Sequence, residues 1–326
     1  MRNESKMLLK DIYRARKAID SWIYRTPLVR SNKLSSPAQR VFLKLETVHD
    51  IGAFKIRGAF NRLLNLSTEQ KASGVVATST GNHGRAIAYA AARLGIRAVV
   101  FMSNLVSADK AVDIEGYGAE VHIVGDNFDE TRTAAEALVT RENMLMVDPF
   151  DDPFIIAGQG TIGLEILEDL PKVDTLLVPV GGGGMISGIA LALKSASPNI
   201  RVIGVSMERG AAMYESINAG KPIEVEELST LADNLGGGIG LDNRYTFNMV
   251  QTYVDDLILV SEDQIASAIK YAFEQEKMII EGAASVGIAA LMNNLVENMG
   301  KEVVTIISSR NINMEVLHQI LCNTKP

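Results

Sequence analysis

The residues Thr175-Leu176-Leu177-Val178-Pro179-Val180-Gly181-Gly182-Gly183-Gly184-Met185 carry the clearest structural signal in the chain. Five of the six residues before the glycines are apolar and predict a buried strand, and the residues after the glycines are typical of a helix. Four consecutive glycines have no side chains, so their backbone N–H groups can surround a phosphate at the start of that helix. We therefore expect a strand, a phosphate-binding loop and a helix in direct succession.

The spacing of these glycines argues against a nucleotide-binding loop. A G-x-G-x-x-G pattern would need a glycine at residue 186 or 187, where Ile186 and Ser187 stand. A G-x-x-x-x-G-K-[ST] pattern would need a lysine after Gly188, where Ile189 stands. The loop suits a phosphate monoester better than a dinucleotide.

The alternation of apolar run, polar turn and amphipathic helical segment continues on both sides of this loop. Runs typical of strands lie at 41–43, 75–78, 98–101, 121–124, 144–147, 175–180, 202–205, 257–260 and 303–307. Helical patterns lie between many of them, as at 85–94, 129–142 and 262–276, and residues 1–20 predict an amphipathic helix. This alternation predicts an α/β fold of parallel sheets flanked by helices.

Four of the expected strands fall between residues 75 and 147, which is enough for a small lobe inserted in a larger one. We expect the small lobe at 71–148 and the large lobe at 1–70 and 149–326. The ligand site is expected in the cleft between the lobes, at the carboxyl ends of the strands.

The composition excludes several classes of protein. The 326 residues carry a net charge of −7 without a cluster of Lys and Arg, which argues against nucleic-acid binding. The single cysteine, Cys322, cannot form an intramolecular disulfide or a cysteine-based metal site. No secretory signal is present at the N-terminus and no apolar run is long enough to span a bilayer. We expect a soluble, cytoplasmic protein.

A candidate reactive amine lies in the stretch Gly52-Ala53-Phe54-Lys55-Ile56-Arg57-Gly58-Ala59. Lys55 follows two apolar residues, and this stretch contains no carboxylate. A buried lysine loses its proton more easily and can attack an aldehyde. An isolated lysine at a helix start is more often solvated, so this signal needs support from elsewhere.

Two further polar stretches follow expected strands. Ser79-Thr80-Gly81-Asn82-His83-Gly84 precedes a helix, whose free N–H groups would form an anion site. Ile307-Ser308-Ser309-Arg310-Asn311 ends the last strand and would direct a serine hydroxyl into the cleft. Each stretch alone is typical of an ordinary turn. Together with Lys55 and the glycine loop, they provide what an aldehyde cofactor with a phosphate arm and an amino-acid substrate require.

Because these four stretches occur in this order along the chain, the sequence resembles the threonine dehydratase and serine racemase family of pyridoxal-phosphate enzymes. The likeness extends from Arg25-Thr26-Pro27-Leu28 through Ser308, and it includes Ala157-Gly158-Gln159-Gly160-Thr161-Ile162 and Ile280-Glu281-Gly282-Ala283. The resemblance implies the two-lobed fold type II (tryptophan synthase beta-like), a homodimer, and elimination of water from a small β-hydroxy amino acid.

The resemblance also implies a role for each matching residue. Lys55 would hold the cofactor and move the Cα proton, and Thr80 is the second candidate for catalysis. The other residues expected to bind the cofactor are Phe54, Asn82, Gly181, Gly182, Gly183, Gly184, Met185 and Ser308. The residues expected to bind the substrate are Ser79, Thr80, Gly81, His83, Gln159 and Arg310.

A serine opposite the pyridine nitrogen has a chemical consequence. A hydroxyl at Ser308 would keep that nitrogen protonated less well than a carboxylate, so a long-lived carbanion is disfavoured and prompt loss of a β-leaving group is favoured. Thr80 keeps racemisation open, because racemases of this family have a hydroxyl there and dehydratases more often have alanine.

The chain departs from the common family pattern at Ala53, Asn234 and the pair Ser309-Arg310. Ser206 and Ala212 stand where several relatives have metal-binding carboxylates, so we expect no metal. These departures, with the tracts 204–213 and 236–245, resemble the hydroxyectoine-utilisation dehydratases. That subgroup implies a ring-opened hydroxyectoine derivative as substrate, an acylated diamino acid with a β-hydroxyl.

Three alternatives stay open. The chain would be a catabolic L-threonine or L-serine dehydratase if only the substrate differs, or a serine racemase-like enzyme. From a different class, it would be a catalytically silent binding protein on the same fold, although intact Lys55, Asn82 and Ser308 count against that.

Overall fold

The computed structural model describes residues 7–79, 81–104, 108–126 and 128–322. The strands are β1 (Leu28–Ser31), β2 (Arg40–Leu45), β3 (Val75–Thr78), β4 (Ala98–Met102), β5 (Glu120–Ile123), β6 (Leu145–Met146), β7 (Thr175–Pro179), β8 (Arg201–Met207), β9 (Asp256–Val260) and β10 (Glu302–Ile307). The α-helices are α1 (Leu9–Ile19), α2 (Lys55–Leu64), α3 (Thr68–Ser73), α4 (Asn82–Leu94), α5 (Ala108–Gly116), α6 (Phe128–Glu142), α7 (Pro153–Asp169), α8 (Gly184–Ala196), α9 (Ala212–Ala219), α10 (Thr246–Tyr253), α11 (Glu262–Tyr271), α12 (Gly282–Met292) and α13 (Met314–Cys322). Short turns of other helix types are η1 (Glu46–Val48), η2 (Asp233–Leu235) and the π-helical η3 (Ala272–Glu276).

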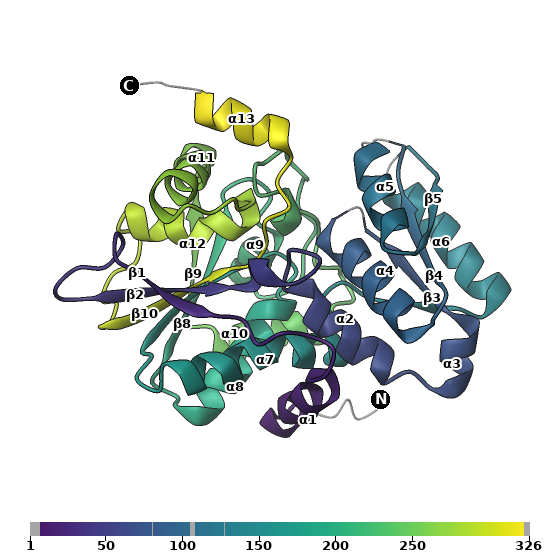
Figure 1. Cartoon of the computed structure of the whole chain (residues 1–326), viewed down its shortest axis with the longest axis horizontal. Coiled ribbons are helices and arrows are strands. Elements are labelled where there is room, and N and C mark those ends of the chain that lie inside the picture. The colour runs from purple at the N-terminus through teal and green to yellow at the C-terminus, as the bar shows by residue number, and fades with distance from the viewer. Residues whose placement is uncertain (1–6, 80, 105–107, 127, 323–326) are drawn as a thin grey trace.

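The described strands form two sheets. One has six strands in the order β1-β2-β10-β7-β8-β9, and the other has four in the order β5-β4-β3-β6. Figure 1 shows α11 and α12 on one face of the six-stranded sheet and α7, α8 and α10 on the other. This arrangement confirms the predicted α/β class, in which buried parallel strands need helices on both faces.

Each of the nine apolar runs overlaps one of the strands β2 to β10. The sequence analysis missed β1, which pairs with β2 in the antiparallel direction, whereas the other pairs in both sheets are parallel. β1 is short and lies at the edge of the sheet, and two of its four residues are exposed. Such a segment has no continuous apolar run, so period and composition do not reveal it.

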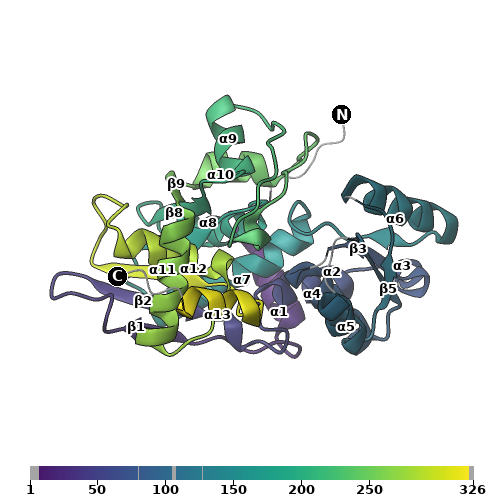
Figure 2. The ribbon, with the colours of Figure 1, turned by 90° about the horizontal axis from the view of Figure 1, so that it is seen from above.

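The four-stranded sheet lies at one end of the molecule. Figures 1 and 2 both place it with α5 and α6 at that end, and α2 and α4 lie between it and the rest of the chain. Its strands come from residues 75 to 146, between two segments that contribute to the six-stranded sheet. The lobe boundaries at 70/71 and 148/149 stay a prediction.

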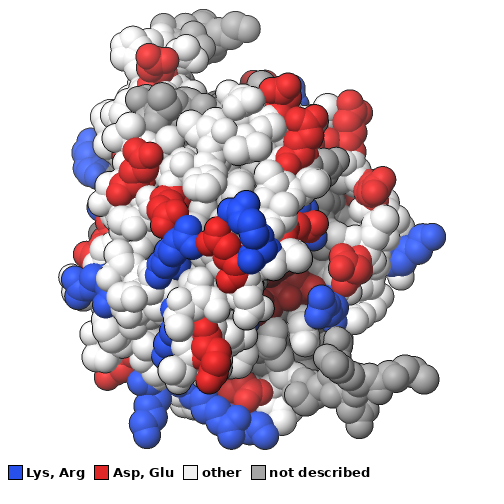
Figure 3. All heavy atoms as spheres, turned by 90° about the vertical axis from the view of Figure 1, so that its right-hand side faces the viewer, with Lys and Arg blue, Asp and Glu red and all other residues white. Residues whose placement is uncertain are grey.

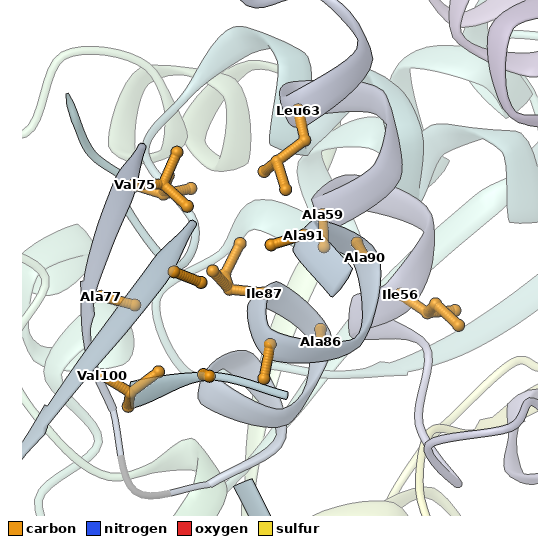
Figure 4. Close-up of a cluster of buried hydrophobic side chains, with 14 of the residues drawn as sticks. Ile56, Ala59, Leu63, Val75, Ala77, Ala86, Ile87, Ala90, Ala91 and Val100 are labelled. Atoms are coloured by element: carbon orange, nitrogen blue, oxygen red, sulfur yellow. The ribbon is translucent and has the colours of Figure 1, made fainter. Parts of the chain in front are cut away.

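An apolar cluster anchors α2, the helix that begins with Lys55. Ala59 and Leu63 of α2 pack toward α4 and the four-stranded sheet (Figure 4), and Ile56 belongs to the same buried cluster. This spacing of three and four residues places all three side chains on one side of the helix. Each is at most 1% exposed, and burial of a leucine contributes roughly 1.5–3 kcal/mol. The start of α2 is therefore held by a packed core.

On the face drawn in Figure 3, basic side chains are interspersed with acidic ones, without a continuous basic area. Among the residues that the structure describes, no helix is long and apolar enough to cross a membrane.

Candidate active site

The backbone brings the Lys55 stretch and the last polar stretch together. Phe54 N donates to Ser308 O at 3.0 Å, and Arg310 N donates to Gly52 O at 2.9 Å. Residues 53 and 309 form an isolated antiparallel bridge between these hydrogen bonds. Since β10 ends at residue 307 and α2 begins at residue 55, this pairing places Lys55 and Ser308 in one site.

Lys55 has no ion-pair partner within salt-bridge distance among the described residues. Its Nζ donates to Pro149 O at 2.7 Å and lies 5.4 Å from the centre of the Phe54 ring. Burial lowers the pKa of Lys55 from an ordinary 10.5 to about 8, against the opposing effect of the Asp148 charge. A substantial fraction of this amine is therefore neutral, and nucleophilic, at mildly basic pH.

The glycine loop has the geometry of an anion cradle. The first intrahelical hydrogen bond of α8 runs from Ser187 N to Gly183 O, so the preceding N–H groups have no helical partner. Gly183 has φ +87°, in the left-handed region that favours glycine. A Cβ on Gly182 would lie 2.2 Å from the Phe150 ring. Glycine is therefore needed at Gly183 for its backbone conformation and at Gly182 because a side chain would not fit. The N–H groups at the start of α8 are available to bind an anion.

Two hydrogen bonds fix the side-chain amide of Asn82. Asn82 Nδ2 donates to Glu281 Oε1 at 2.9 Å, and Asn82 Oδ1 accepts from Asn311 Nδ2 at 2.6 Å. An amide rotated by 180° would face its oxygen to the carboxylate and its NH₂ to another NH₂ group. The observed orientation leaves the second N–H of Asn82 available to an acceptor in the cavity.

Glu281 is a site residue to which the sequence analysis gave no role. It is 2% exposed and directly precedes α12. Its Oε1 accepts from both Asn82 and Asn234, and Oε2 is buried without a well-formed hydrogen bond. Burial raises the pKa of Glu281 to about 7, although the nearby Ser309 hydroxyl opposes the shift. The sequence did carry a signal for this residue, because Glu281 stands in the stretch Ile280-Glu281-Gly282-Ala283 that forms part of the family resemblance.

The start of α4 forms a second anion site. The first intrahelical bond of α4 runs from Arg85 N to Gly81 O, which leaves the earlier N–H groups of the helix without helical partners. His83 Nε2 lies 3.1 Å from Val147 O, and because a carbonyl only accepts, Nε2 carries the proton. Burial, together with the Lys55 charge, lowers the pKa of His83 to about 3, so the imidazole is neutral. Ser79 Oγ accepts from Gly81 N at 3.4 Å, whereas Thr80 lies outside the described residues.

The structure does not bring Gln159 and Arg310 into this cavity. Gln159 is 1% exposed in α7, and its Oε1 accepts from Gly58 N at 3.3 Å, which gives it a role in packing α7 against α2. The Arg310 side chain is exposed and passes over Gly52, where a Cβ would lie 2.9 Å from Arg310 Cγ. Neither residue lines the cavity, and Ser79, Gly81 and His83 do not line it either, so the substrate-binding assignments stay predictions.

All the residues expected to bind the cofactor line one cavity, together with Phe150, Pro179, Asn234, Leu235, Glu281 and Ala283. The amine of Lys55, the glycine loop with the start of α8, and the free N–H of Asn82 all belong to its wall. This donor set fits an aldehyde with a phosphate arm and a ring hydroxyl, as pyridoxal phosphate has. The roles of the individual residues stay predictions.

A buried ion network includes Arg57, which lies two residues after Lys55 in α2. Arg57 Nε donates to Glu46 Oε2 at 2.7 Å, and Arg57 Nη1 donates to Glu165 Oε1 at 2.6 Å. Lys44 Nζ also donates to Glu165, at 2.7 Å, so two cations face two anions. Burial disfavours the charge on Arg57, but both carboxylates raise its pKa further. The network ties α2 to η1 and α7 and so fixes the start of α2.

The chain is similar to known proteins over nearly its whole length. The model of a family described as pyridoxal-phosphate dependent enzyme matches residues 19–309. The chain is 47% identical to a putative threonine dehydratase of Sinorhizobium fredii, over 98% of this chain and 97% of the relative. It is 41% identical to the L-threonine ammonia-lyase of Thermotoga maritima, over 96% and 78%. The structure of maize serine racemase superposes with a TM-score of 0.91 at 31% identity, covering 97% of each chain.

Proposed function

The chain belongs to the family of pyridoxal-phosphate dependent enzymes, as a lyase that uses this cofactor, and on this premise we propose that it eliminates water from a β-hydroxy amino acid. The observation that carries the proposal is the pairing of a lysine of lowered pKa with a glycine-lined anion cradle in one cavity. Ser308 lines the same cavity. A carboxylate at this position would favour a longer-lived carbanion, whereas a serine hydroxyl favours prompt loss of the β-leaving group.

Each residue of the cavity has a distinct task in this proposal. Pyridoxal phosphate, when bound, supplies a reactive aldehyde and a ring that accepts negative charge from Cα. Lys55 Nζ would hold the cofactor and would take the proton from the substrate Cα, and its lowered pKa favours the neutral amine that accepts a proton. The free N–H of Asn82 would donate to the ring oxygen, and the first N–H groups of α8 would hold the phosphate.

The substrate carboxylate is assigned to the start of α4. The N–H groups at 82–84 supply donors there, and Ser79 and the neutral imidazole of His83 lie beside them. We assign Thr80 to the cofactor face opposite Lys55. In the overall reaction the Cα–H and Cβ–O bonds break, the hydroxyl leaves as water, and the released enamine takes up water to give a 2-oxo acid and ammonia.

We further propose that the substrate is a ring-opened hydroxyectoine derivative, which is an acylated diamino acid with a β-hydroxyl. Support comes from residues that depart from the common family pattern, of which Asn234 lies at the wall of the cavity. Dehydration of L-threonine or L-serine is the second candidate, favoured by the threonine ammonia-lyase of Thermotoga maritima among the relatives. The family resemblance also supports a homodimer in the cytoplasm.

The experiment that tests the proposal begins with the absorbance spectrum of the purified protein and of Lys55→Ala. A yellow band that is lost in Lys55→Ala, but kept in the exposed control Lys172→Ala, assigns the cofactor to Lys55. Release of 2-oxo acid is then measured with the ring-opened hydroxyectoine derivative, L-threonine and L-serine. Turnover of the first alone supports the specialised substrate, and turnover of L-threonine instead selects the general dehydratase. A protein that binds no pyridoxal phosphate would overturn the proposal in favour of a silent binding protein.

A further inference from the structure

A second cavity of about 480 Å³ adjoins the cofactor cavity. Asn82, Asn234 and Glu281 line both cavities and so form the wall between them. One side of this outer cavity comes from the start of α4, at Gly81 and Arg85, and the other comes from loops and helices next to the six-stranded sheet. Because Gly81 belongs to the proposed carboxylate site, the outer cavity begins where a bound amino acid would lie.

The amide of Asn234 is held in one orientation at this wall. Asn234 Nδ2 donates to Glu281 Oε1 at 3.0 Å and to Asp233 Oδ1 at 3.1 Å. Both N–H groups are therefore used, and a rotated amide would place its oxygen against two carboxylate oxygens. Asn234 Oδ1 is directed to Gly81 instead, at 2.4 Å from the position that a Cβ on Gly81 would take.

This amide oxygen is an available acceptor. It accepts no hydrogen bond that the structure records. The Asn234 side chain is exposed and lies between the two cavities. The acceptor stands beside the proposed carboxylate site, where a substrate side chain would pass.

The charges of the outer cavity restrict which side chain would fit. Of its two arginines, Arg85 pairs with Asp113 at 2.5 Å. Arg209 Nη1 donates to the backbone carbonyl Ser229 O at 3.0 Å and has no carboxylate partner among the described residues. The acidic residues Asp233, Glu262 and Asp263 also line it. These acidic residues outnumber Arg209, so a second substrate carboxylate would meet more like charge than opposite charge, whereas an N–H group would meet acceptors.

We propose that Asn234 selects substrates whose side chain carries a nitrogen with an N–H, in an amide or an amine, and that the outer cavity receives this group. Asn234 Oδ1 accepts the N–H, and threonine, whose side chain ends one carbon beyond Cβ, leaves the outer cavity empty. This inference rests on the proposed amino-acid site and extends it to the class of side chain.

The test is equilibrium binding to the cofactor-loaded enzyme by calorimetry, with three amino acids that lack the β-hydroxyl. They are L-2-aminobutyrate, L-aspartate and Nγ-acetyl-L-2,4-diaminobutyrate, which differ in the group attached to Cβ. We expect the acetylated diamino acid to bind about tenfold more tightly than 2-aminobutyrate, as one further hydrogen bond and a filled cavity imply, and aspartate to bind most weakly. Asn234→Gly should remove most of this preference, measured as the ratio of the affinities of the acetylated diamino acid and 2-aminobutyrate in the same variant.

Two further variants keep the result interpretable. Asn234→Ala also removes the acceptor but keeps a restricted backbone, and Asn298→Gly is the matched control, at an exposed position with φ +54°. An unchanged preference in both Asn234 variants would overturn the inference, as would tighter binding of aspartate than of the acetylated diamino acid. Because the readout is binding, an Asn234-dependent preference without oxo-acid release would instead refute the dehydratase and leave this inference standing.

Discussion

The lowered pKa of Lys55 predicts that this lysine destabilises the cofactor-free protein in a pH-dependent way. The perturbation is Lys55→Met, which keeps a long unbranched side chain and removes the charge. In the folded chain burial brings the pKa of Lys55 from 10.5 to about 8, so the folded state disfavours the proton that the unfolded state binds. Replacement should therefore stabilise the cofactor-free chain at neutral pH.

The magnitude can be worked out from the two pKa values. Below pH 8 both states bind the proton, and the difference between 10.5 and about 8 corresponds to about 3 kcal/mol at about 1.4 kcal/mol per pH unit. Part of the side chain is exposed, so about 3 kcal/mol is an upper value. Between pH 8 and 10.5 the unfolded state binds more protons than the folded state, so the wild-type chain gains stability as the pH rises. Above pH 10.5 the contribution of the charge is gone.

The assay is urea unfolding of the cofactor-free wild type and Lys55→Met at pH 7 and pH 10. We expect the variant to have the higher free energy of unfolding at pH 7, and the difference to shrink by about 2 kcal/mol at pH 10. The exposed control Lys172→Met should show no such pH dependence. A difference between Lys55→Met and wild type that is the same at both pH values would refute the argument, because a purely apolar gain from methionine does not titrate.

Three further predictions concern the cavity and its support. Gly182→Ala should weaken pyridoxal-phosphate binding by at least about tenfold in a fluorescence titration, since its Cβ would lie 2.2 Å from the Phe150 ring. Glu281→Gln should remove a limb near pH 7 from the pH profile of kcat/KM, because burial raises the pKa of this carboxyl to about 7 and the variant does not titrate. Arg57→Met should lower the free energy of unfolding by about 3–5 kcal/mol in urea, since it leaves Glu46 buried without its cation.

Each of these predictions has an outcome that contradicts it. Unchanged cofactor affinity in Gly182→Ala would mean that the loop is wider in solution than the contact with Phe150 allows. A pH profile of Glu281→Gln with the same limb would assign the titration to another group. A loss below about 1 kcal/mol in Arg57→Met would show that the buried network contributes little net stability, as some buried ion pairs do.

Much of the fold could be predicted because its signals are local. A buried parallel strand must be apolar along its whole length, so the run 175–180 is recognisable without knowledge of its neighbours. The glycine loop is visible for a similar reason, since a backbone that surrounds an anion has no room for side chains. The residues expected to bind the cofactor could be selected because four separate signals and a family resemblance agreed.

What the sequence alone determined about this protein is the α/β class and the residues expected to bind the cofactor, all of which line its cavity. Only the tertiary structure revealed that Glu281 orients Asn82, that Asn234 presents a free amide oxygen beside Gly81, and that Gln159 serves packing. The physical reason is that strand burial depends on a residue's own character and near neighbours. A pKa, an amide orientation or a free acceptor instead depends on groups that lie tens to hundreds of residues away in the chain, and only the folded arrangement brings these together.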